Sequence, residues 1–205
     1  MFFVEYDRVP EAKYPTAVEQ AYAVTKFVAE QGTDLQVDST RLAILGDGYG
    51  GNLAAAVTLM ARERRGPKID LQVLLYPMVD ANFGTRSYTT FAEGPWLTRQ
   101  AMERFWNAYL PDVTARNQIT ATPLNASVDQ LIGVPDAVVI VAENDVLRDE
   151  GECYARKLSI AGVRVTSTRY NGTIHDFLLL NALSDTPAAC SALAQVTAAL
   201  RAVLE

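Results

Sequence analysis

Three short loops contain residue types that could carry out chemistry, and each of them follows a short apolar run. The first is a glycine-rich turn at residues 46–51, the second contains Asp145, and the third contains His175, the single histidine of the chain. A carboxylate can orient a histidine and stabilise its protonated form, and the histidine can then act as a general base. Any mechanism that needs an imidazole must therefore use His175, and Asp145 is the candidate that orients it.

The glycine-rich turn has the spacing of a nucleophile elbow, in which a strained turn holds one side chain above a sheet. It consists of Gly46, Asp47, Gly48, Tyr49, Gly50 and Gly51. A phosphate-binding loop is the rival interpretation, but the Lys and the Ser or Thr of a P-loop are absent, and Asp47 would repel a phosphate. A merely tight turn between a strand and a helix is the simplest alternative.

Asp145 and His175 also have simpler structural interpretations. Aspartate is common at strand–helix junctions as a turn or cap residue, and a lone histidine is more often structural than catalytic. Both residues nevertheless follow predicted strands, and the ligand sites of parallel α/β sheets lie beyond the carboxyl ends of their strands. Their positions therefore favour a functional role for Asp145 and His175 over a purely structural one.

The elements that must position these loops alternate between short strands and longer helices. Strands are predicted at residues 1–6, 41–45, 71–76, 137–142 and 163–170. Helices are predicted from Thr16 with Glu19 at capping-box spacing, at 52–65, from Thr98, after Asp149 and Glu152 as caps, and at 188–204. This alternation predicts an α/β fold with a mainly parallel sheet and right-handed crossovers.

Residues 1–205 are expected to form one domain, because a chain of 205 residues buries an adequate core and no linker or repeat interrupts it. Within this domain, residues 80–97 are rich in turn formers and lead into a helix with a stripe of large apolar side chains. The stripe consists of Met102, Phe105, Trp106 and Tyr109. Two interpretations stay open, namely core packing and a cap-like segment at residues 80–110 that lines an apolar pocket.

The composition excludes several classes of protein and partner. A hydrophobic fraction of 49% argues against disorder, and a net charge of −6 argues against nucleic acid as a partner. No apolar run approaches the ~18 residues of a membrane span, and no secretory signal or metal or cofactor motif is visible. Cys153 and Cys190 form no disulfide or metal pattern, which favours a reducing cytoplasm.

Five motifs, in order, resemble those of the hormone-sensitive-lipase-like carboxylesterases, which have the α/β-hydrolase fold. Residues 5–11 (EYDRVPE) resemble the family's "DYRLAPE", and residues 45–54 (LGDGYGGNLA) resemble its "GDSAGGNLA" elbow. Residues 75–77 (LYP), 145–150 (DVLRDE, family "DPLRDE") and 172–177 (GTIHDF, family "GMIHGF") follow. The resemblance extends from the first residue to nearly the last.

This resemblance implies a mainly parallel hydrolase sheet flanked by helices and the hydrolysis of small acyl esters by a serine nucleophile. By position, Asp145 would be the triad acid and His175 the base. The backbone N–H of Tyr49, which follows the nucleophile position, would be one oxyanion donor. A small acyl ester or a carboxylate is the expected ligand, and no cofactor is implied.

Two departures from the family pattern put the activity in doubt. The nucleophile position holds Gly48, so an acyl-enzyme cannot form there, and the phenol of Tyr49, with an ordinary pKa of ~10, is a poor substitute. The family's His-Gly-Gly-Gly oxyanion loop, its first strands and its N-terminal cap have no counterpart in the sequence. We therefore expect an inactive or very weak esterase. A ligand-binding protein on a hydrolase scaffold and an interaction fragment completed by another chain are the alternatives.

The missing strands have a consequence for the sheet. In the family, a strand lies between those that correspond to residues 2–6 and 41–45, and its loss would leave a gap or an open edge. Residues 2–6 are therefore expected to shift and pair with 41–45, or two copies are expected to join across the exposed edge.

Overall fold

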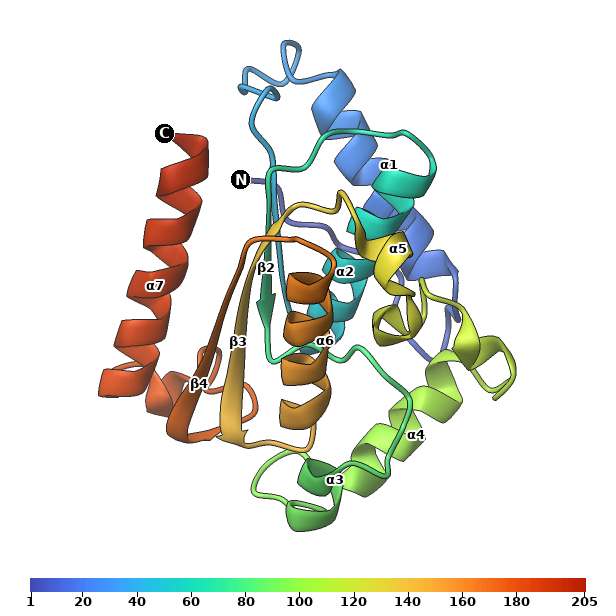
Figure 1. The fold of residues 1–205 in the computed structure, drawn as a ribbon, viewed down its shortest axis with the longest axis vertical. Helices are drawn as coiled ribbons and strands as arrows, with labels where there is room; N and C mark the ends of the chain where they lie inside the picture. The colour runs from blue at the N-terminus through green and yellow to red at the C-terminus, as the bar shows by residue number, and fades with distance from the viewer.

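The computed structural model describes residues 1–205 and places a four-stranded parallel sheet at the centre of the molecule (Figure 1). The strand order is β1-β2-β3-β4, so each strand pairs with its neighbour in the sequence. The strands are β1 (Ala43–Asp47), β2 (Leu71–Leu75), β3 (Asp136–Asn144) and β4 (Val165–Ile174). The carboxyl ends of all four strands therefore lie at one edge of the sheet.

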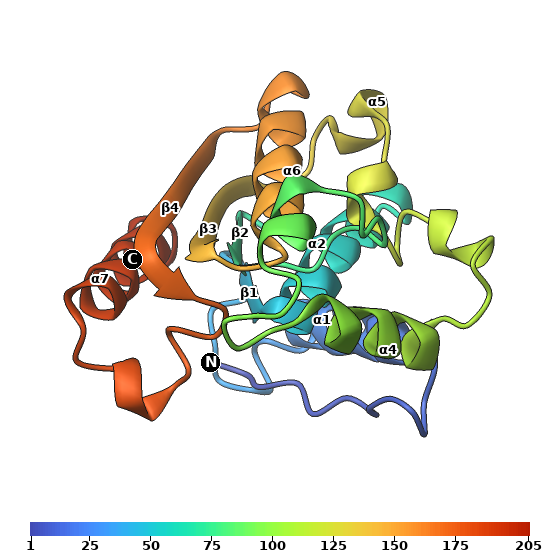
Figure 2. The ribbon, with the colours of Figure 1, turned by 90° about the horizontal axis from the view of Figure 1, so that it is seen from below.

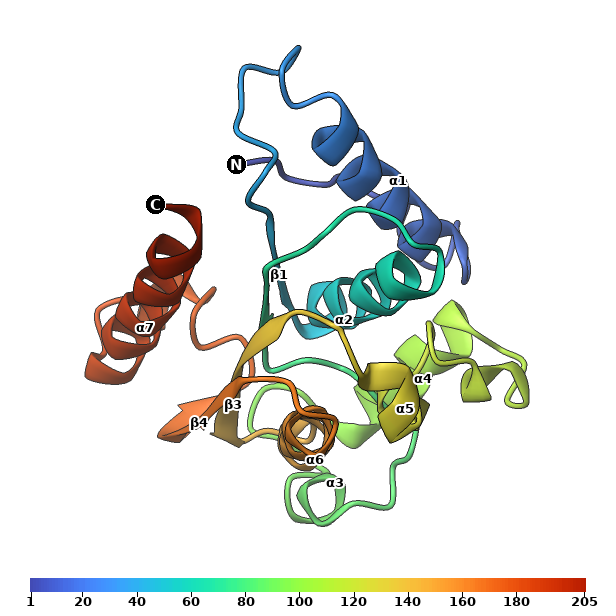
Figure 3. The same cartoon turned by 45° about the horizontal axis from the view of Figure 1, so that its top comes forward.

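Helices cover both faces of this sheet (Figures 2 and 3). On one face α2 and α6 pack against the strands, and α1 packs on the outside of α2; α7 lies on the opposite face. The helices are α1 (Thr16–Glu30), α2 (Gly48–Glu63), α3 (Arg86–Thr90), α4 (Arg99–Tyr109), α5 (Val128–Leu131), α6 (Arg148–Ile160) and α7 (Pro187–Leu204), with 3-10 turns at Ala115–Asn117, Pro123–Asn125 and Asn181–Leu183. The fold is the α/β architecture predicted from the sequence.

The central strand β3 shows why an uninterrupted apolar run was needed. Val139 and Val141 point into the core beneath α2 and α6, whereas Val138 and Ile140 point toward α7. Alternate side chains of a strand face opposite sides of the sheet, so a strand covered on both faces has no solvent-facing position. The sequence of β3 is apolar for this reason.

One predicted helix start and two predicted capping arrangements are wrong, whereas α1 starts at Thr16 as predicted. Helix α2 begins at Gly48 and not at residue 52, because Gly48 turns the chain from strand into helix at once. The residue before α1 is Pro15, which makes no capping bond, and Glu19 instead forms an ion pair with Arg64 at 2.6 Å. No side chain caps α6. Its acidic side chains are bound elsewhere: Asp149 accepts the N–H of Ser87, and Glu152 pairs with Arg169.

Residues 1–6 are not a strand, which corrects the prediction that residues 2–6 pair with β1. Residues 1–8 have no regular secondary structure, and β1 pairs with β2 alone. The segment is held by α1 instead: the backbone N–H of Asp7 donates to Gln20 Oε1 at 2.9 Å, and Gln20 Nε2 donates to Asp7 Oδ2 at 2.7 Å. Tyr6 also packs edge-on against the ring of Tyr49. Because these contacts fix the segment beside α1, β1 is left as an open edge of the sheet.

The segment at 80–110 packs beside the carboxyl edge of the sheet as α3 and α4. Thr98 caps α4 by accepting the N–H of Ala101, as the predicted start at Thr98 requires. The helix buries Trp106 and Tyr109 against Val146 in the loop after β3. The aromatic stripe therefore belongs to the core, and it also supports the loop that contains Asp145.

Helix α7 is the one helix that is long and apolar enough to cross a membrane by length and composition alone. This is weak evidence, since a helix that packs on a soluble core passes the same test. Ala189, Ala192 and Val196 of α7 are buried against the sheet. That contact accounts for three apolar residues of α7, whereas 17% of the helix as a whole is buried.

Candidate active site

The three loops singled out in the sequence meet at the carboxyl edge of the sheet. Asp47 and Gly48 stand at the end of β1, Asp145 directly follows β3, and His175 directly follows β4. The parallel arrangement of these strands brings together residues that are far apart in the sequence, as expected for a site in an open α/β sheet. The predicted convergence of elbow, Asp145 and His175 is therefore present in the geometry.

The turn at the end of β1 has the tight geometry of an elbow. Gly48 has a φ of +47°, a left-handed conformation that side chains disfavour. A Cβ on Gly46 would lie 2.0 Å from the carbonyl oxygen of Gly50, and one on Gly51 would lie 2.9 Å from the Cβ of Pro77. Close packing therefore requires glycine at positions 46 and 51. This requirement is compatible with both interpretations of the turn, a nucleophile elbow and a merely tight strand–helix connection.

Asp145 and His175 form a buried pair. His175 Nδ1 lies 2.7 Å from Asp145 Oδ2, and Asp145 Oδ1 accepts the backbone N–H of Leu147 at 3.0 Å. The two residues are 1% and 7% exposed, respectively, so neither group is solvated. A carboxylate in this position holds the imidazole with Nδ1 protonated, which leaves Nε2 free to accept a proton.

The other ring nitrogen of His175 faces the elbow. A Cβ built on Gly48 would lie 3.4 Å from His175 Nε2 and 3.6 Å from Cε1. A hydroxyl on that carbon would be within hydrogen-bond reach of Nε2, which is the geometry of an activated nucleophile. The chain thus keeps the positions of a nucleophile, a base and an acid, while Gly48 has no side chain to attack with.

Asp176 contributes a second carboxylate that the sequence analysis did not assign to the site. Its Oδ1 lies 3.3 Å from His175 Nε2, and its Oδ2 accepts the indole N–H of Trp96 at 3.0 Å. Asp176 has a φ of +61°, a conformation that favours glycine. The available signal was the aspartate at the position where the family motif "GMIHGF" has its second glycine.

These acidic groups change the protonation of His175. Burial lowers the pKa of His175, but Asp145, Asp176 and Asp47 together outweigh that effect, and its pKa is raised above the ordinary value. The pKa of Asp47 is also raised, because Asp47 is partly buried and lies near Asp176. The imidazole is thus surrounded by negative charge, which favours its protonated form.

Tyr49 and Tyr76 frame the site without supplying a nucleophile. The ring of Tyr49 packs edge-on against Phe105 and Tyr109, and burial raises the pKa of its phenol well above the ordinary value. Tyr76, also with a raised pKa through burial, packs edge-on against His175 with ring centroids 4.9 Å apart. Neither phenol is therefore ionised at neutral pH, as expected for Tyr49 from its residue type.

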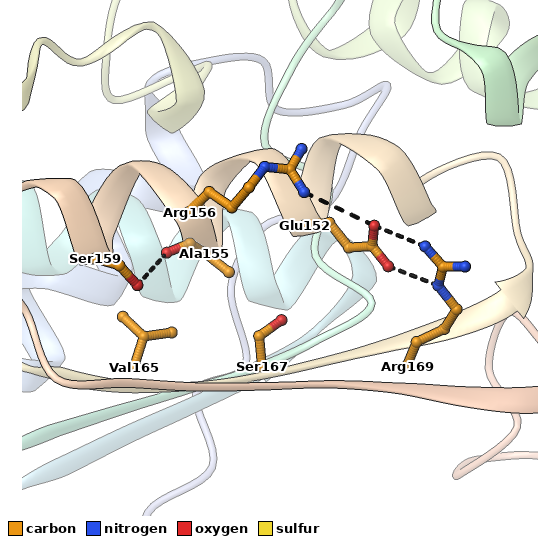
Figure 4. A pocket seen from close by; sticks show the side chains of 7 residues that line it. All are labelled: Glu152, Ala155, Arg156, Ser159, Val165, Ser167 and Arg169. Carbon is orange, nitrogen blue, oxygen red and sulfur yellow. Dashed lines mark hydrogen bonds and ion pairs between the residues drawn. The ribbon is translucent and has the colours of Figure 1, made fainter.

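A separate surface groove of about 460 Å³ lies between α6 and β4 and shares no residue with this site (Figure 4). Its lining residues are Glu152, Ala155, Arg156, Ser159, Val165, Ser167 and Arg169. Glu152 lies 2.7 Å from Arg169 and 3.9 Å from Arg156, so it already pairs with both guanidinium groups (Figure 4). The groove consequently contains one carboxylate and two guanidinium groups, an excess of one positive charge, at an exposed surface.

Fold and site together define a serine-hydrolase scaffold, and the family comparison agrees. A model described as "alpha/beta hydrolase fold" matches residues 1–179. The chain therefore belongs to the α/β-hydrolase family, and its relatives are esterases of the hormone-sensitive-lipase-like group.

Individual relatives show the same relationship. The chain is 39% identical to a putative alpha/beta hydrolase of Acanthamoeba polyphaga mimivirus, over 92% of this chain and 54% of the relative. It is 34% identical to carboxylesterase NlhH of Mycobacterium tuberculosis, over 98% of this chain and 63% of the relative. A crystal structure of an esterase from Pseudomonas putida is 53% identical with a TM-score of 0.97, over 98% of this chain and 63% of that one. The chain thus spans between half and two thirds of the length of these proteins.

Proposed function

We propose that the chain carries the acyl-ester site of a carboxylesterase and that Gly48 leaves it with little or no turnover of the serine type. The observation that carries this proposal is the position of Gly48, whose Cβ would lie 3.4 Å from His175 Nε2. In this proposal Asp145 is the acid that orients the histidine, His175 is the base, and Tyr49 provides one oxyanion N–H. Loss of the nucleophile alone removes most of the catalysis in such a triad.

The residual reaction would use water in place of a serine oxygen. His175 Nε2 would take a proton from a water molecule, and the hydroxide would attack the ester carbonyl carbon. The bond between that carbon and the alkoxy oxygen would then break, and the imidazolium would give its proton to the leaving alkoxide, so that the products are the carboxylic acid and the alcohol. This route forms no acyl-enzyme, and the backbone N–H of Tyr49 would contribute one hydrogen bond to the oxyanion. One oxyanion donor is worth about 3 kcal/mol, and this contribution does not replace the attacking oxygen that Gly48 lacks.

Turnover of p-nitrophenyl butyrate by the wild-type chain and by Gly48→Ser tests the proposal. We expect Gly48→Ser to be at least about 100-fold faster, because it restores the attacking oxygen next to His175. The double variant Gly48→Ser/His175→Ala should fall to the level of His175→Ala, at or below that of the wild-type chain. Fast turnover by the wild-type chain that disappears in His175→Ala would show that the site works without a serine.

A binding protein on the hydrolase scaffold is the second candidate. It is favoured by the intact Asp145–His175 pair, which is buried although the residue that it faces has no side chain. Calorimetric titration with butyrate and with ethyl butyrate distinguishes the two functions. Binding of either compound without any hydrolysis over hours supports a binding role, whereas slow product formation supports the weak esterase.

Location and association are also proposals. Cys153 and Cys190 are both free and exposed, and free exposed thiols persist in a reducing compartment, so we propose a cytoplasmic location. Fractionation of cells that express a tagged chain tests this. The open edge at β1 is proposed as the surface through which two copies associate.

A further inference from the structure

Gly48 leaves room beside a general base. Apart from its own neighbours, the only atoms within 4 Å of a Cβ built on Gly48 are Nε2 and Cε1 of His175. Both contacts, at 3.4 and 3.6 Å, are ordinary van der Waals distances, so the position would accept this atom without displacing anything. A separate small molecule could therefore occupy the place of the absent side chain and contact Nε2.

Two acceptors face this place from the loop after β4. His175 Nε2 can accept one proton when the imidazole is neutral, because Asp145 holds the other ring nitrogen at 2.7 Å. The raised pKa of His175 moves this neutral state to higher pH, so the reaction is measured at about pH 8.5. Asp176 Oδ1 lies 3.3 Å from Nε2 and can accept a second hydrogen bond from the same molecule. A neutral molecule with two or more hydrogens on its attacking atom matches both acceptors, whereas an alcohol has one hydrogen to donate.

We propose that the chain contains an acyltransferase site. Small external amines of the hydroxylamine class bind beside Gly48 at this site and take the acyl group of an ester. The inference rests on the proposed acyl-ester site and adds the identity of the second substrate. Water competes for the same place. Hydroxylamine attacks an ester faster than water does because its nitrogen is the stronger nucleophile.

The reaction balances without any further reactant. The nitrogen of hydroxylamine forms a bond to the ester carbonyl carbon while His175 Nε2 takes one of its protons. The bond between the carbonyl carbon and the ester oxygen then breaks, and the imidazolium gives its proton to the leaving alkoxide. The products are a hydroxamic acid and the free alcohol, and His175 is returned to its neutral form.

The test measures hydroxamate formation from ethyl butyrate and hydroxylamine by the colour of its ferric complex. The wild-type chain should show saturation with hydroxylamine and a rate at least 10-fold above that of Gly48→Ala and of His175→Ala. Gly48→Ala is the matched control, since its methyl group fills the place without adding a nucleophile. Far-ultraviolet circular dichroism establishes that each variant is folded.

A separate variant tests whether Asp176 acts as the second hydrogen-bond acceptor. Asp176→Gly, which keeps the left-handed backbone acceptable, alters the basicity of His175 for both nucleophiles and should in addition raise the KM for hydroxylamine about 5-fold more than the KM for methanol. Asp34→Gly, at an exposed turn away from the site, should alter neither reaction. An equal effect of Asp176→Gly on methanol and hydroxylamine would overturn the assignment of Asp176 as the second acceptor.

Gly48→Ser separates failure of this inference from failure of the proposed function. If Gly48→Ser hydrolyses ethyl butyrate but the wild-type chain makes no hydroxamate above the Gly48→Ala level, the inference is overturned and the acyl-ester site stands. If Gly48→Ser is inert and no hydroxamate forms, both are overturned. Saturable hydroxamate formation that is lost in Gly48→Ala supports both.

Discussion

The Oδ2 atom of Asp145 lies 2.7 Å from the Nδ1 atom of His175, and both side chains are more than nine-tenths buried. Removing two ionisable groups from water is costly unless they bind each other, so this pair is coupled to folding whether or not it is used in catalysis. Asp176 at the opposite ring nitrogen strengthens the coupling. The pair should therefore be visible in stability measurements as well as in kinetics.

The first prediction concerns pH. The pKa of His175 is raised in the folded state, although burial opposes this, because Asp145, Asp176 and Asp47 surround it. The folded state then binds the proton more tightly than the unfolded state does. The contribution to stability is fully present below the unfolded pKa of about 6.5 and is lost as pH rises through the higher folded-state pKa.

Urea unfolding of the wild-type chain and His175→Gln at about pH 5.5 and pH 8.5 measures this effect. Glutamine can still donate to Asp145 but does not titrate. The free-energy difference between the wild-type chain and the variant should be larger at the lower pH. A difference that grows at the higher pH would show that the histidine is neutral in the folded chain.

The elements that pack by simple periodicity were predictable from the sequence. The buried run of β3 and the spacing of α7 need no information from other parts of the chain, and both were placed to within two residues. Residues 1–6 were misassigned because an apolar, β-rich run forms a strand only where another strand can pair with it. That partner is a property of the whole sheet.

The site likewise contains features that the sequence predicts and features that depend on the folded structure. The order of elbow, Asp145 and His175 was readable, since each loop follows its own strand. The contact between Asp176 and His175 Nε2 was not readable, because it depends on a left-handed backbone at Asp176 and on the side chain of Trp96. Adjacent residues usually point apart, so sequence neighbours are poor evidence of contact.

The second prediction concerns how much stability is lost when alanine replaces two different glycines of the elbow. Gly46→Ala would place a methyl group 2.0 Å from the carbonyl oxygen of Gly50, a contact that the backbone can relieve only by moving. We expect a loss of about 3 kcal/mol or more in unfolding free energy. Gly50→Ala is the matched control, because its Cβ would meet only Asp47 Oδ1 at 3.6 Å.

Gly50 lies inside α2, where alanine has a better helix propensity, so Gly50→Ala should stay within about 1 kcal/mol of the wild-type chain. Urea unfolding of both variants provides the comparison. Equal losses in the two variants would mean that the turn is looser than the distances at Gly46 indicate.

The third prediction is a stability cost of restoring the nucleophile. Gly48 has a φ of +47°, and a residue with a Cβ in this conformation is strained by roughly 1–2 kcal/mol. Gly48→Ser should therefore lower the melting temperature by about 2–8 °C for a domain of this size while it gains esterase activity. Gly48→Ala, which has the same backbone strain and no hydroxyl, should show the same thermal shift. A serine variant that melts above the wild-type chain would contradict this account of the elbow.

The last prediction concerns the open edge of the sheet. The outer backbone groups of β1 have no strand partner, and Leu45 on this strand is 47% exposed. Leu45 lies opposite Val73 in the register with β2, so it stands on the face of the sheet that α7 covers elsewhere. An exposed edge with an apolar side chain favours pairing with another strand, and a twofold dimer would pair β1 with β1.

Size-exclusion chromatography with light scattering at about 50 μM should show a dimer for the wild-type chain and a monomer for Leu45→Lys, because a charge on an edge strand opposes pairing. Leu193→Lys is the matched control, since Leu193 is an exposed leucine, 61% accessible, on α7 and away from the edge. That variant should remain dimeric. A lysine at the centre of a β1–β1 pair would place two like charges within a few residues of each other. A monomeric wild-type chain, or a dimer that survives Leu45→Lys, would therefore show that the β1 edge is not the surface of association.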